Sequence, residues 1–229
     1  MLATIIDEAP RFFTYYNGIF LLEAMLGTFL LAAVGSVFGT LAGFGIAVAR
    51  RTRSALLIPA RVFGVFVVEI FRRVPFLVTL MLMFFAFQLT HGNASVFVVA
   101  IATVCVIATA YISEIIRAGF DSVHRNQWDA AAAMNMSLWQ QIRLVVLPQA
   151  WKVILPPVFS FFILFIKDTA LASQIGVLEL TYAGKVLNNK GFSAALVFGT
   201  VLVLYFLLSY PLARLGAYME GRLAPSRNR

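Results

Sequence analysis

Five ionisable residues interrupt two long apolar segments, and they are the side chains best placed to do chemistry. They are Glu69, Arg72, Arg73, Lys167 and Asp168. A charge inside an apolar segment is costly and needs a partner or water, so such residues mark candidate sites. Two interpretations stay open. The side chains either contact a polar solute, or they serve structural pairing or gating, with Glu69 paired to Arg72 or Arg73 and Lys167 with Asp168 directed toward a neighbouring helix.

The sequence contains no residue pattern typical of metal binding or of nucleotide hydrolysis. His91 and His124 are not near a cluster of carboxylates or cysteines at metal-ligand spacing, so we predict no metal site. The G-x-x-x-x-G-K-[ST] pattern that cradles phosphates is also missing, because Gly184-Lys185 lacks its upstream glycine. We therefore predict that the chain is not an enzyme and does not hydrolyse ATP by the usual route.

Composition places the five residues in a membrane protein. Of 229 residues, 61% are hydrophobic and 12% are charged, whereas about 25% of residues are charged in a typical soluble domain. The net charge is +8, but lysine and arginine cluster between apolar runs rather than along one face. This distribution indicates membrane topology, with lipid as a partner, and argues against nucleic-acid binding.

Five segments are long and apolar enough to cross a bilayer, whose core of about 30 Å needs about 20 helical residues. They cover residues 20–49, 62–90, 94–117, 153–178 and 192–214. The sequence thus predicts an all-α, polytopic protein with a single transmembrane domain over residues 1–229. We expect no secretory signal peptide, because Asp7, Glu8 and Arg11 precede the first span, which should therefore be retained.

Positive charges in the connections predict the orientation. The basic connections contain Arg50, Arg51, Arg53 and Arg61 after the first span, Arg117, Arg125, Arg143 and Lys152 between the third and fourth, and Arg214, Arg222, Arg227 and Arg229 around the fifth. The opposite side holds only Arg11, Lys185 and Lys190. With five spans, this asymmetry places the N-terminus outside and the C-terminus inside.

Two further patterns concern helix packing. Apolar residues between Leu2 and Tyr16 recur at three- and four-residue spacing, which predicts either an amphipathic interfacial helix or a frayed terminus. Gly35, Gly39 and Gly43 share one stripe of the first span. The stripe indicates either close packing of another helix or the ordinary glycine content of membrane helices.

The connection over residues 118–151 looks too ordered for a simple linker. Gln127–Met134 predicts a helix, Asn135 suits a left-handed turn, and Ser137 opens an S-x-x-Q capping box. The second helix should end before Pro148. The apolar side chains expected to be exposed are Trp128, Met136, Leu138, Trp139, Ile142, Val145 and Val146. So much apolar surface predicts either a protein partner or packing back onto the spans or the bilayer.

Four collinear motifs resemble those of ATP-binding-cassette importer permeases for polar amino acids. Their F-R-G-T-P-L-L-V segment is similar to Phe71-Arg-Arg-Val-Pro-Phe-Leu-Val78, and their K-D-T-S-L resembles Lys167-Asp-Thr-Ala-Leu171. Residues 110–119 resemble the segment before their EAA loop. The EAA loop itself is similar to residues 127–137 with the downstream Leu-Pro of residues 146–150. One motif alone is weak, whereas four in the same order are specific.

The motifs depart from the family pattern at four positions. Asp129 stands where the EAA loop usually has Glu, and Asn135 stands where it usually has Gly. Arg73 and Val74 replace the Gly and Thr of the F-R-G-T-P segment. Asp keeps the carboxylate on a shorter stem, and Asn keeps access to positive φ. We therefore expect a working loop with an altered fit.

The resemblance implies a type I importer permease fold. In that family two permease subunits, identical or related, enclose a path, and each EAA loop lies in a groove on a cytoplasmic ATPase subunit. The residues implied to contact the ATPase are Gln127, Asp129, Ala130, Ala131, Met134, Asn135, Met136, Leu138 and Trp139. ATP and Mg²⁺ would bind the ATPase, with no cofactor in this chain. An extracytoplasmic solute-binding protein would dock on residues 90–93 and 176–191.

The implied function is that of a multi-pass permease subunit in the bacterial plasma (inner) membrane. It would import a polar amino acid or a related solute, such as an opine or a compatible solute, and it would couple ATPase movement to alternating access. Two alternatives stay open. In the first, the chain is a secondary transporter or channel in which Lys167 and Asp168 relay protons or ions. In the second, it is a scaffold that docks an ATPase and does not transport a solute.

Overall fold

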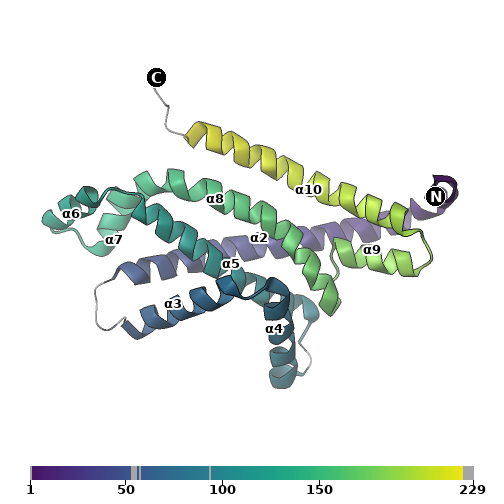
Figure 1. The fold of residues 1–229 in the computed structure, drawn as a ribbon, viewed down its shortest axis with the longest axis horizontal. Coiled ribbons are helices and arrows are strands. Elements are labelled where there is room, and N and C mark those ends of the chain that lie inside the picture. The colour runs from purple at the N-terminus through teal and green to yellow at the C-terminus, as the bar shows by residue number, and fades with distance from the viewer. Residues whose placement is uncertain (1, 53–55, 57, 93, 224–229) are drawn as a thin grey trace. The chain divides into compact units, whose positions relative to one another are not determined.

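The computed structural model describes residues 2–52, 56, 58–92 and 94–223, and all regular structure in this part of the chain is helical (Figure 1). The α-helices are α1 (Leu2–Phe12), α2 (Tyr15–Arg51), α3 (Ile58–Arg73), α4 (Phe76–His91), α5 (Val96–Asp121), α6 (Arg125–Ala133), α7 (Leu138–Gln140), α8 (Leu147–Asp168), α9 (Leu180–Asn189) and α10 (Ala194–Leu223). A π-helical turn, η2 (Gln141–Val146), and a 3₁₀ helix, η3 (Thr169–Ile175), complete the set. The all-α prediction is confirmed. Arg53, Asn93, Arg227 and Arg229, and the side chain of His91, lie outside the described residues.

Four helical runs in the described ranges are long and apolar enough to cross a membrane. They are α2, α5, α10 and the continuous run Leu138–Ile175. The predicted span 62–90 is broken between α3 and α4, and it brings the number to five when the broken pair counts as one span. The break falls at Val74 and Pro75. Proline lacks a backbone N–H and disfavours helical geometry in the residue before it, which explains the position.

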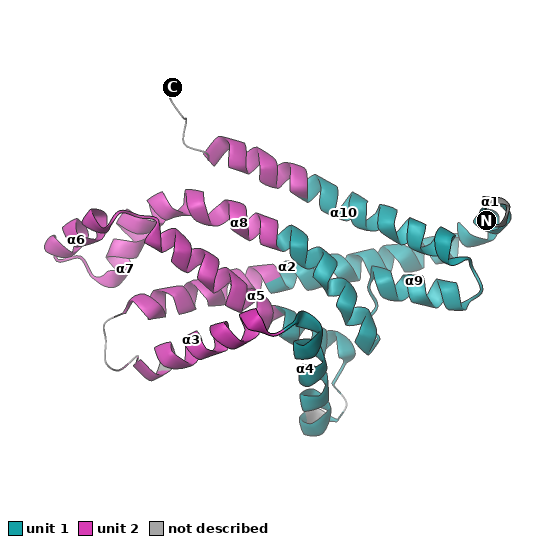
Figure 2. Cartoon of the chain, in the orientation of Figure 1, with its two compact units in different colours: residues 1–35, 75–104, 162–212 teal, residues 36–74, 105–161, 213–229 magenta. Residues whose placement is uncertain are grey.

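The chain divides into two compact units (Figure 2). Unit 1 comprises residues 1–35, 75–104 and 162–212, and unit 2 comprises residues 36–74, 105–161 and 213–229. The boundaries fall inside α2, α5, α8 and α10, so each of these helices contributes to both units.

In unit 1 the predicted N-terminal helix forms as α1 and is fixed at its end. Phe12 is fully buried, and its ring meets that of Phe192 edge-on at a centroid distance of 5.2 Å. Glu8 accepts a hydrogen bond at 2.8 Å from the backbone N–H of Ser193, just before α10 begins. A frayed terminus is therefore wrong for this helix.

A buried carboxylate organises the start of α9 in the same unit. Glu179 is fully buried and caps the helix, because its Oε1 accepts from the N–H of Tyr182 at 2.6 Å. Its Oε2 accepts from the N–H of Thr181 at 2.9 Å and from the hydroxyl of Tyr205 at 2.7 Å. Burial raises the pKa of the Glu179 carboxyl, and the hydrogen bonds partly oppose that rise.

This carboxylate predicts a pH dependence of folding. A raised pKa means that the folded state favours the protonated carboxyl, so the stabilisation is complete below the ordinary value of about 4.3 and is lost as pH rises through the folded-state pKa. Each pH unit within that window should cost about 1.4 kcal/mol. Glu179→Gln keeps a neutral cap acceptor and should flatten this part of the profile of thermal stability in detergent. An equally steep profile in the variant would contradict the burial argument.

The glycine stripe of α2 lies against α5. A Cβ atom at Gly39 would lie 2.6 Å from the Cβ of Ala108, and one at Gly43 would lie 2.8 Å from a backbone nitrogen of α5, both in unit 2. In unit 1, a Cβ at Gly35 would lie 2.1 Å from a methyl carbon of Val104. Real Cβ atoms do not approach so closely. The prediction of a close-packed helix is confirmed.

Candidate functional site

The connection over residues 118–151 folds as the predicted helix–turn–helix. Helix α6 ends at Ala133, and Asn135 follows in the left-handed conformation with a φ of 58°. The capping box then forms in both directions: the N–H of Ser137 donates to Gln140 Oε1 at 2.8 Å, and the N–H of Gln140 donates to Ser137 Oγ at 3.4 Å. Local sequence therefore specifies the end of α6, the turn at Asn135 and the start of α7.

The second helix does not end before Pro148, contrary to the prediction. Helix α7 continues through η2 into α8, and the N–H of Leu147 donates to the carbonyl of Ile142, five residues earlier. Pro148 has no N–H, and its ring would clash with the carbonyl four residues before it in an α-helix. The π turn shifts the hydrogen-bond register ahead of the proline, which allows the helix to continue.

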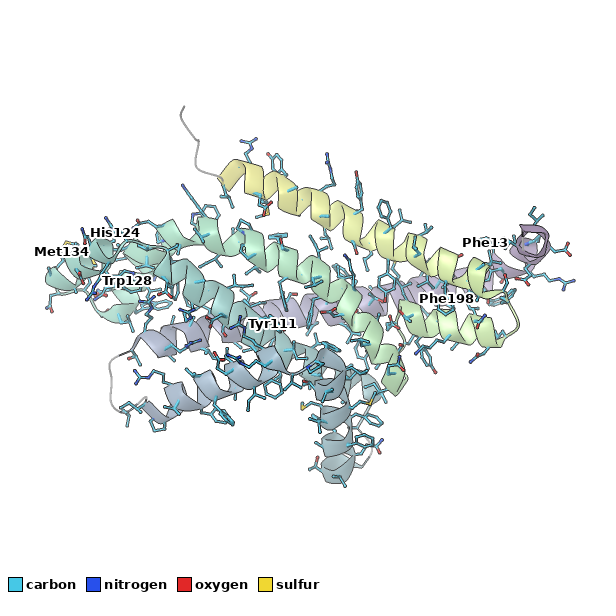
Figure 3. The ribbon with its side chains drawn as sticks, viewed as in Figure 1. Phe13, Tyr111, His124, Trp128, Met134 and Phe198 are labelled. Carbon is cyan, nitrogen blue, oxygen red and sulfur yellow. The ribbon has the colours of Figure 1, made fainter. Side chains whose placement is uncertain are left out.

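Exposed apolar and acidic side chains share the surface of this segment. Met134 is 64% exposed and Trp139 is 54% exposed, and the side chain of Asp129 is 68% exposed. Figure 3 shows Met134, Trp128 and His124 together near α6. Ile142 and Val146 are fully buried, so their predicted exposure is wrong. They lie four residues apart on the helix face that packs inside unit 2.

The other residues implied to contact a partner differ in exposure. Ala130 is exposed, whereas Ala131 is 1% exposed and packs within the chain. Gln127 is exposed, and its Oε1 lies 3.5 Å from Gln149 Nε2. Side chains at Trp128, Met136, Leu138 and Val145 are half-buried. The accessible part of the predicted surface is thus centred on Asp129, Met134 and Trp139.

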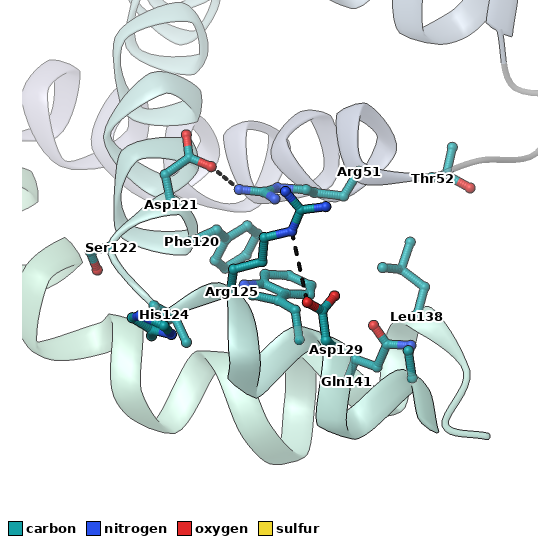
Figure 4. Close-up of a pocket in the computed structure, with 13 residues that line it drawn as sticks. Arg51, Thr52, Phe120, Asp121, Ser122, His124, Arg125, Asp129, Leu138 and Gln141 are labelled. Atoms are coloured by element: carbon teal, nitrogen blue, oxygen red, sulfur yellow. Dashed lines mark hydrogen bonds and ion pairs between the residues drawn. The ribbon is translucent and has the colours of Figure 1, made fainter. Parts of the chain in front are cut away.

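A hollow of about 920 Å³ lies beside this surface in unit 2 (Figure 4). Its wall contains side chains from the end of α2, the end of α5 and both short helices. Arg51 forms an ion pair with Asp121, and the Nε of Arg125 lies 3.8 Å from the Oδ2 of Asp129. The guanidinium carbon of Arg51 lies 4.9 Å from the centroid of the Trp128 ring, which also lines the recess. The recess therefore combines both signs of charge with an aromatic surface.

Arg51 and Asp121 line the recess beside the predicted docking surface, and sequence analysis did not single them out. Arg51 counted only toward the charge asymmetry, although its guanidinium carbon lies 4.9 Å from the centroid of the Trp128 ring. Phe44 was not singled out either, and its ring lies 6.3 Å from that of Trp139. The seven-residue spacing of Phe44 and Arg51 puts both on one helix face, and this is the signal that indicates a common role.

An ion network centred on Glu114 joins α2, α3 and α5 within unit 2. Glu114 accepts from Arg50 at 2.9 Å and from the Nε of Arg117 at 2.7 Å. Arg72 Nη1 lies 3.9 Å from the same carboxylate. The side chain of Glu114 is 17% exposed, so water screens these ion pairs less than it screens pairs on the surface. The network thus connects the end of α2 and the end of α3 to α5.

Glu69 forms an ion pair with one of its two predicted partners. Its carboxylate lies 2.7 Å from Arg73 Nη2, one helical turn away, and Arg73 is the partner rather than Arg72. The guanidinium of Arg72 instead packs 5.9 Å from the ring centroid of Tyr111, near Glu114. All three residues of the α3 group thus have protein partners.

Lys167 and Asp168 lie in unit 1, at the end of α8. Lys167 is exposed, Asp168 is half-buried, and no ion pair within the described ranges includes either residue. The pairing of Lys167 with Asp168 therefore stays a prediction. Over the same ranges, no group of three or more His, Cys, Asp or Glu side chains is placed to hold a metal ion.

Comparison with known sequences gives consistent matches over most of the chain. Residues 35–224 match the family model described as binding-protein-dependent transport system inner membrane component. The probable amino-acid ABC transporter permease YckA of Bacillus subtilis is 31% identical over 197 residues, covering 86% of this chain and 84% of the relative. The glutamine transport system permease GlnP of Escherichia coli is 32% identical over 201 residues, with 83% and 85% covered. The Bacillus subtilis L-cystine permease TcyB is 33% identical over 198 residues, with 86% and 83% covered.

Solved structures share the fold. A crystal structure of an amino acid ABC transporter with histidines has a TM-score of 0.80 and 25% identity, covering 90% of this chain and 94% of its own. An inward-facing MetNI methionine ABC transporter has a TM-score of 0.78 at 22% identity, covering 93% and 100%. These matches confirm the type I importer permease fold that the motifs implied.

Proposed function

The chain belongs to the family of binding-protein-dependent transport system inner membrane components, and we propose that it imports a polar amino acid or a related small solute with energy from a separate ATPase. As a permease subunit it is a multi-pass protein of the bacterial inner membrane and not an enzyme. The amino-acid class of the solute is supported by the names of its relatives, which include glutamine and L-cystine permeases.

The ordered projection formed by α6 and α7 is the observation that carries the coupling part of this proposal. Asp129, Met134 and Trp139 give it an exposed acidic and apolar surface on a short, well-capped helical unit. A small helix with such a surface suits a groove on another protein, where apolar contacts supply affinity and the carboxylate supplies orientation. We assign that groove to a cytoplasmic ATPase subunit, which would bind ATP and Mg²⁺.

The proposed mechanism is a transfer of movement from the ATPase to the spans. Closure of two ATPase subunits would displace the helix–turn–helix, and the close-packed α2 and α5 would carry that displacement as a rigid pair. A second permease subunit, identical or related, would complete the path. An extracytoplasmic binding protein would deliver solute, with the N-terminus outside and the C-terminus inside as the positive charges indicate.

The charges along the path divide into two groups in this proposal. Glu69 and Arg73 form an ion pair, which suits a structural or gating role, and Arg72 joins the Glu114 cluster. Lys167 and Asp168 are then the candidates for direct solute contact, because a zwitterionic solute needs both signs of charge.

ATP-dependent uptake of labelled amino acids is the experiment that tests the proposed function. Proteoliposomes would contain the chain with its ATPase and binding protein, and one or more amino acids should accumulate at least tenfold above vesicles without ATP. Omission of the binding protein serves as the control and should abolish the accumulation. ATP turnover without accumulation across the panel would favour the scaffold, and accumulation driven by an ion gradient without ATP would favour a secondary transporter.

A further inference from the structure

Four aromatic rings and one arginine attach the helix–turn–helix to the long helices of unit 2. The ring of Phe44 in α2 lies 5.9 Å from that of Phe120 in α5 and 6.3 Å from that of Trp139. Phe120 in turn lies 6.4 Å from Trp128 of α6, edge-on. The guanidinium carbon of Arg51 lies 4.9 Å from the Trp128 ring centroid. These distances are in the range of favourable edge-to-face and cation–π contacts.

Arg51 is held from two directions. Its guanidinium forms an ion pair with Asp121 at the end of α5, and Asp121 also accepts a hydrogen bond from Arg117. The side chain of Arg51 is 30% exposed and that of Asp121 is 44% exposed. The two side chains form their ion pair although both are partly accessible to solvent. One guanidinium thus connects α2, α5 and α6 at a single point.

The position of these contacts would allow movement of α6 and α7 to reach α2. Helix α6 is joined to α5 through residues 122–124, and α7 continues through η2 into α8. Helix α2 is far from α6 and α7 in the sequence, so its direct connection to these two helices consists of side-chain contacts. Among these contacts, those of Arg51 and Phe44 come from one face of α2 and engage α6 and α7 respectively.

We propose that Arg51 and Asp121 are positioning residues that transmit displacement of α6 and α7 to the ends of α2 and α5. The inference rests on the proposed docking of an ATPase on the same helices, and it adds the contacts by which movement reaches the spans. Packed side chains do not deform continuously, so a small displacement of α6 and α7 should also displace the ends of α2 and α5. Without the connection, displacement of the docked helices would still reach α5 and α8 along the chain, but the end of α2 would lose its direct contacts with α6 and α7.

The test compares transport with ATP hydrolysis in the complete complex. In Arg51→Gln, binding of the ATPase and its rate of hydrolysis should stay within about twofold of wild type, while solute imported per ATP hydrolysed should fall at least fivefold. Arg51→Lys keeps a positive charge for both Asp121 and Trp128 and should retain at least half of the wild-type ratio. A merely structural role would lower yield and both activities together, without changing the ratio.

Two further variants make the test decisive. Asp121→Asn removes the charge at constant size and should lower the ratio in the same direction as Arg51→Gln. Arg61→Gln is the matched control, because Arg61 donates to the carbonyl of Thr52 at 3.3 Å and has no contact with Trp128 or Asp121; its ratio should be unchanged. An unchanged ratio in both Arg51→Gln and Asp121→Asn would overturn the inference, as would loss of ATPase binding in both. A wild-type complex without ATP-driven uptake would instead refute the proposed function.

Discussion

Gly39→Leu should prevent the chain from forming a stable fold in the membrane. A Cβ at this position would lie 2.6 Å from the Cβ of Ala108 and 2.8 Å from its carbonyl carbon, and the latter atom is backbone that cannot rotate away. Helices α2 and α5 would have to separate, with loss of the packing that drives helix association in lipid. Overpacking costs about 1–3 kcal/mol where side chains can adjust, and here the backbone must move, so the cost should exceed that range. The measurement is the monodisperse fraction and the thermal midpoint of the purified chain in detergent.

Gly45→Leu is the matched control for this prediction. Gly45 lies in the same helix, and a Cβ added there would meet no atom within 4 Å. This variant should keep the wild-type elution profile and thermal midpoint. If Gly39→Leu were as stable as Gly45→Leu, α2 and α5 would not be packed as closely as the structure places them.

Local patterns in the sequence were sufficient for the helices and for the turn at Asn135. Hydrophobic length predicted four helical runs that could cross a membrane, whereas the fifth predicted span, residues 62–90, is bent by 118° between α3 and α4. The capping box at Ser137 formed as its spacing indicated. These features depend on interactions between residues a few positions apart, which a sequence displays directly. The close approach at Gly39 was also foreseeable, because only the absence of a side chain permits it.

Features that depend on packing between distant segments were not predictable. Pro148 indicated a helix end, but the π turn before it lets the helix continue, and periodicity does not show such a shift of register. The burial of Ile142 and Val146 depends on which helix face meets unit 2. Arg51 was counted as one basic residue of a connection, because its contacts with Asp121 and Trp128 join positions about 70 residues or more apart.

Asp129→Arg should abolish association of the chain with its ATPase subunit while leaving the fold intact. The carboxylate is 68% exposed, and its partner Arg125 is 90% exposed at a distance of 3.8 Å, so their ion pair contributes little to stability. At an interface, loss of one partner of a desolvated charge pair costs about 2–5 kcal/mol, and reversal of the charge adds repulsion. Because about 1.4 kcal/mol changes affinity tenfold, binding should weaken by about 30-fold or more. The measurement is the amount of co-expressed ATPase that purifies with the chain from solubilised membranes.

Two variants control this experiment. Asp129→Glu keeps the carboxylate and should retain ATPase binding. Asp7→Arg reverses an exposed charge in α1, on the terminus predicted to lie outside, and should have no effect.

The proposed coupling requires that an ATPase subunit binds the helix–turn–helix around Asp129. Copurification of the ATPase with wild type, Asp129→Glu, Asp7→Arg and Asp129→Arg, each checked for membrane insertion and elution profile, measures this directly. The expected result is equal ATPase recovery for the first three chains and almost none for Asp129→Arg. Undiminished recovery with Asp129→Arg, in a chain that is inserted and folded, would contradict it.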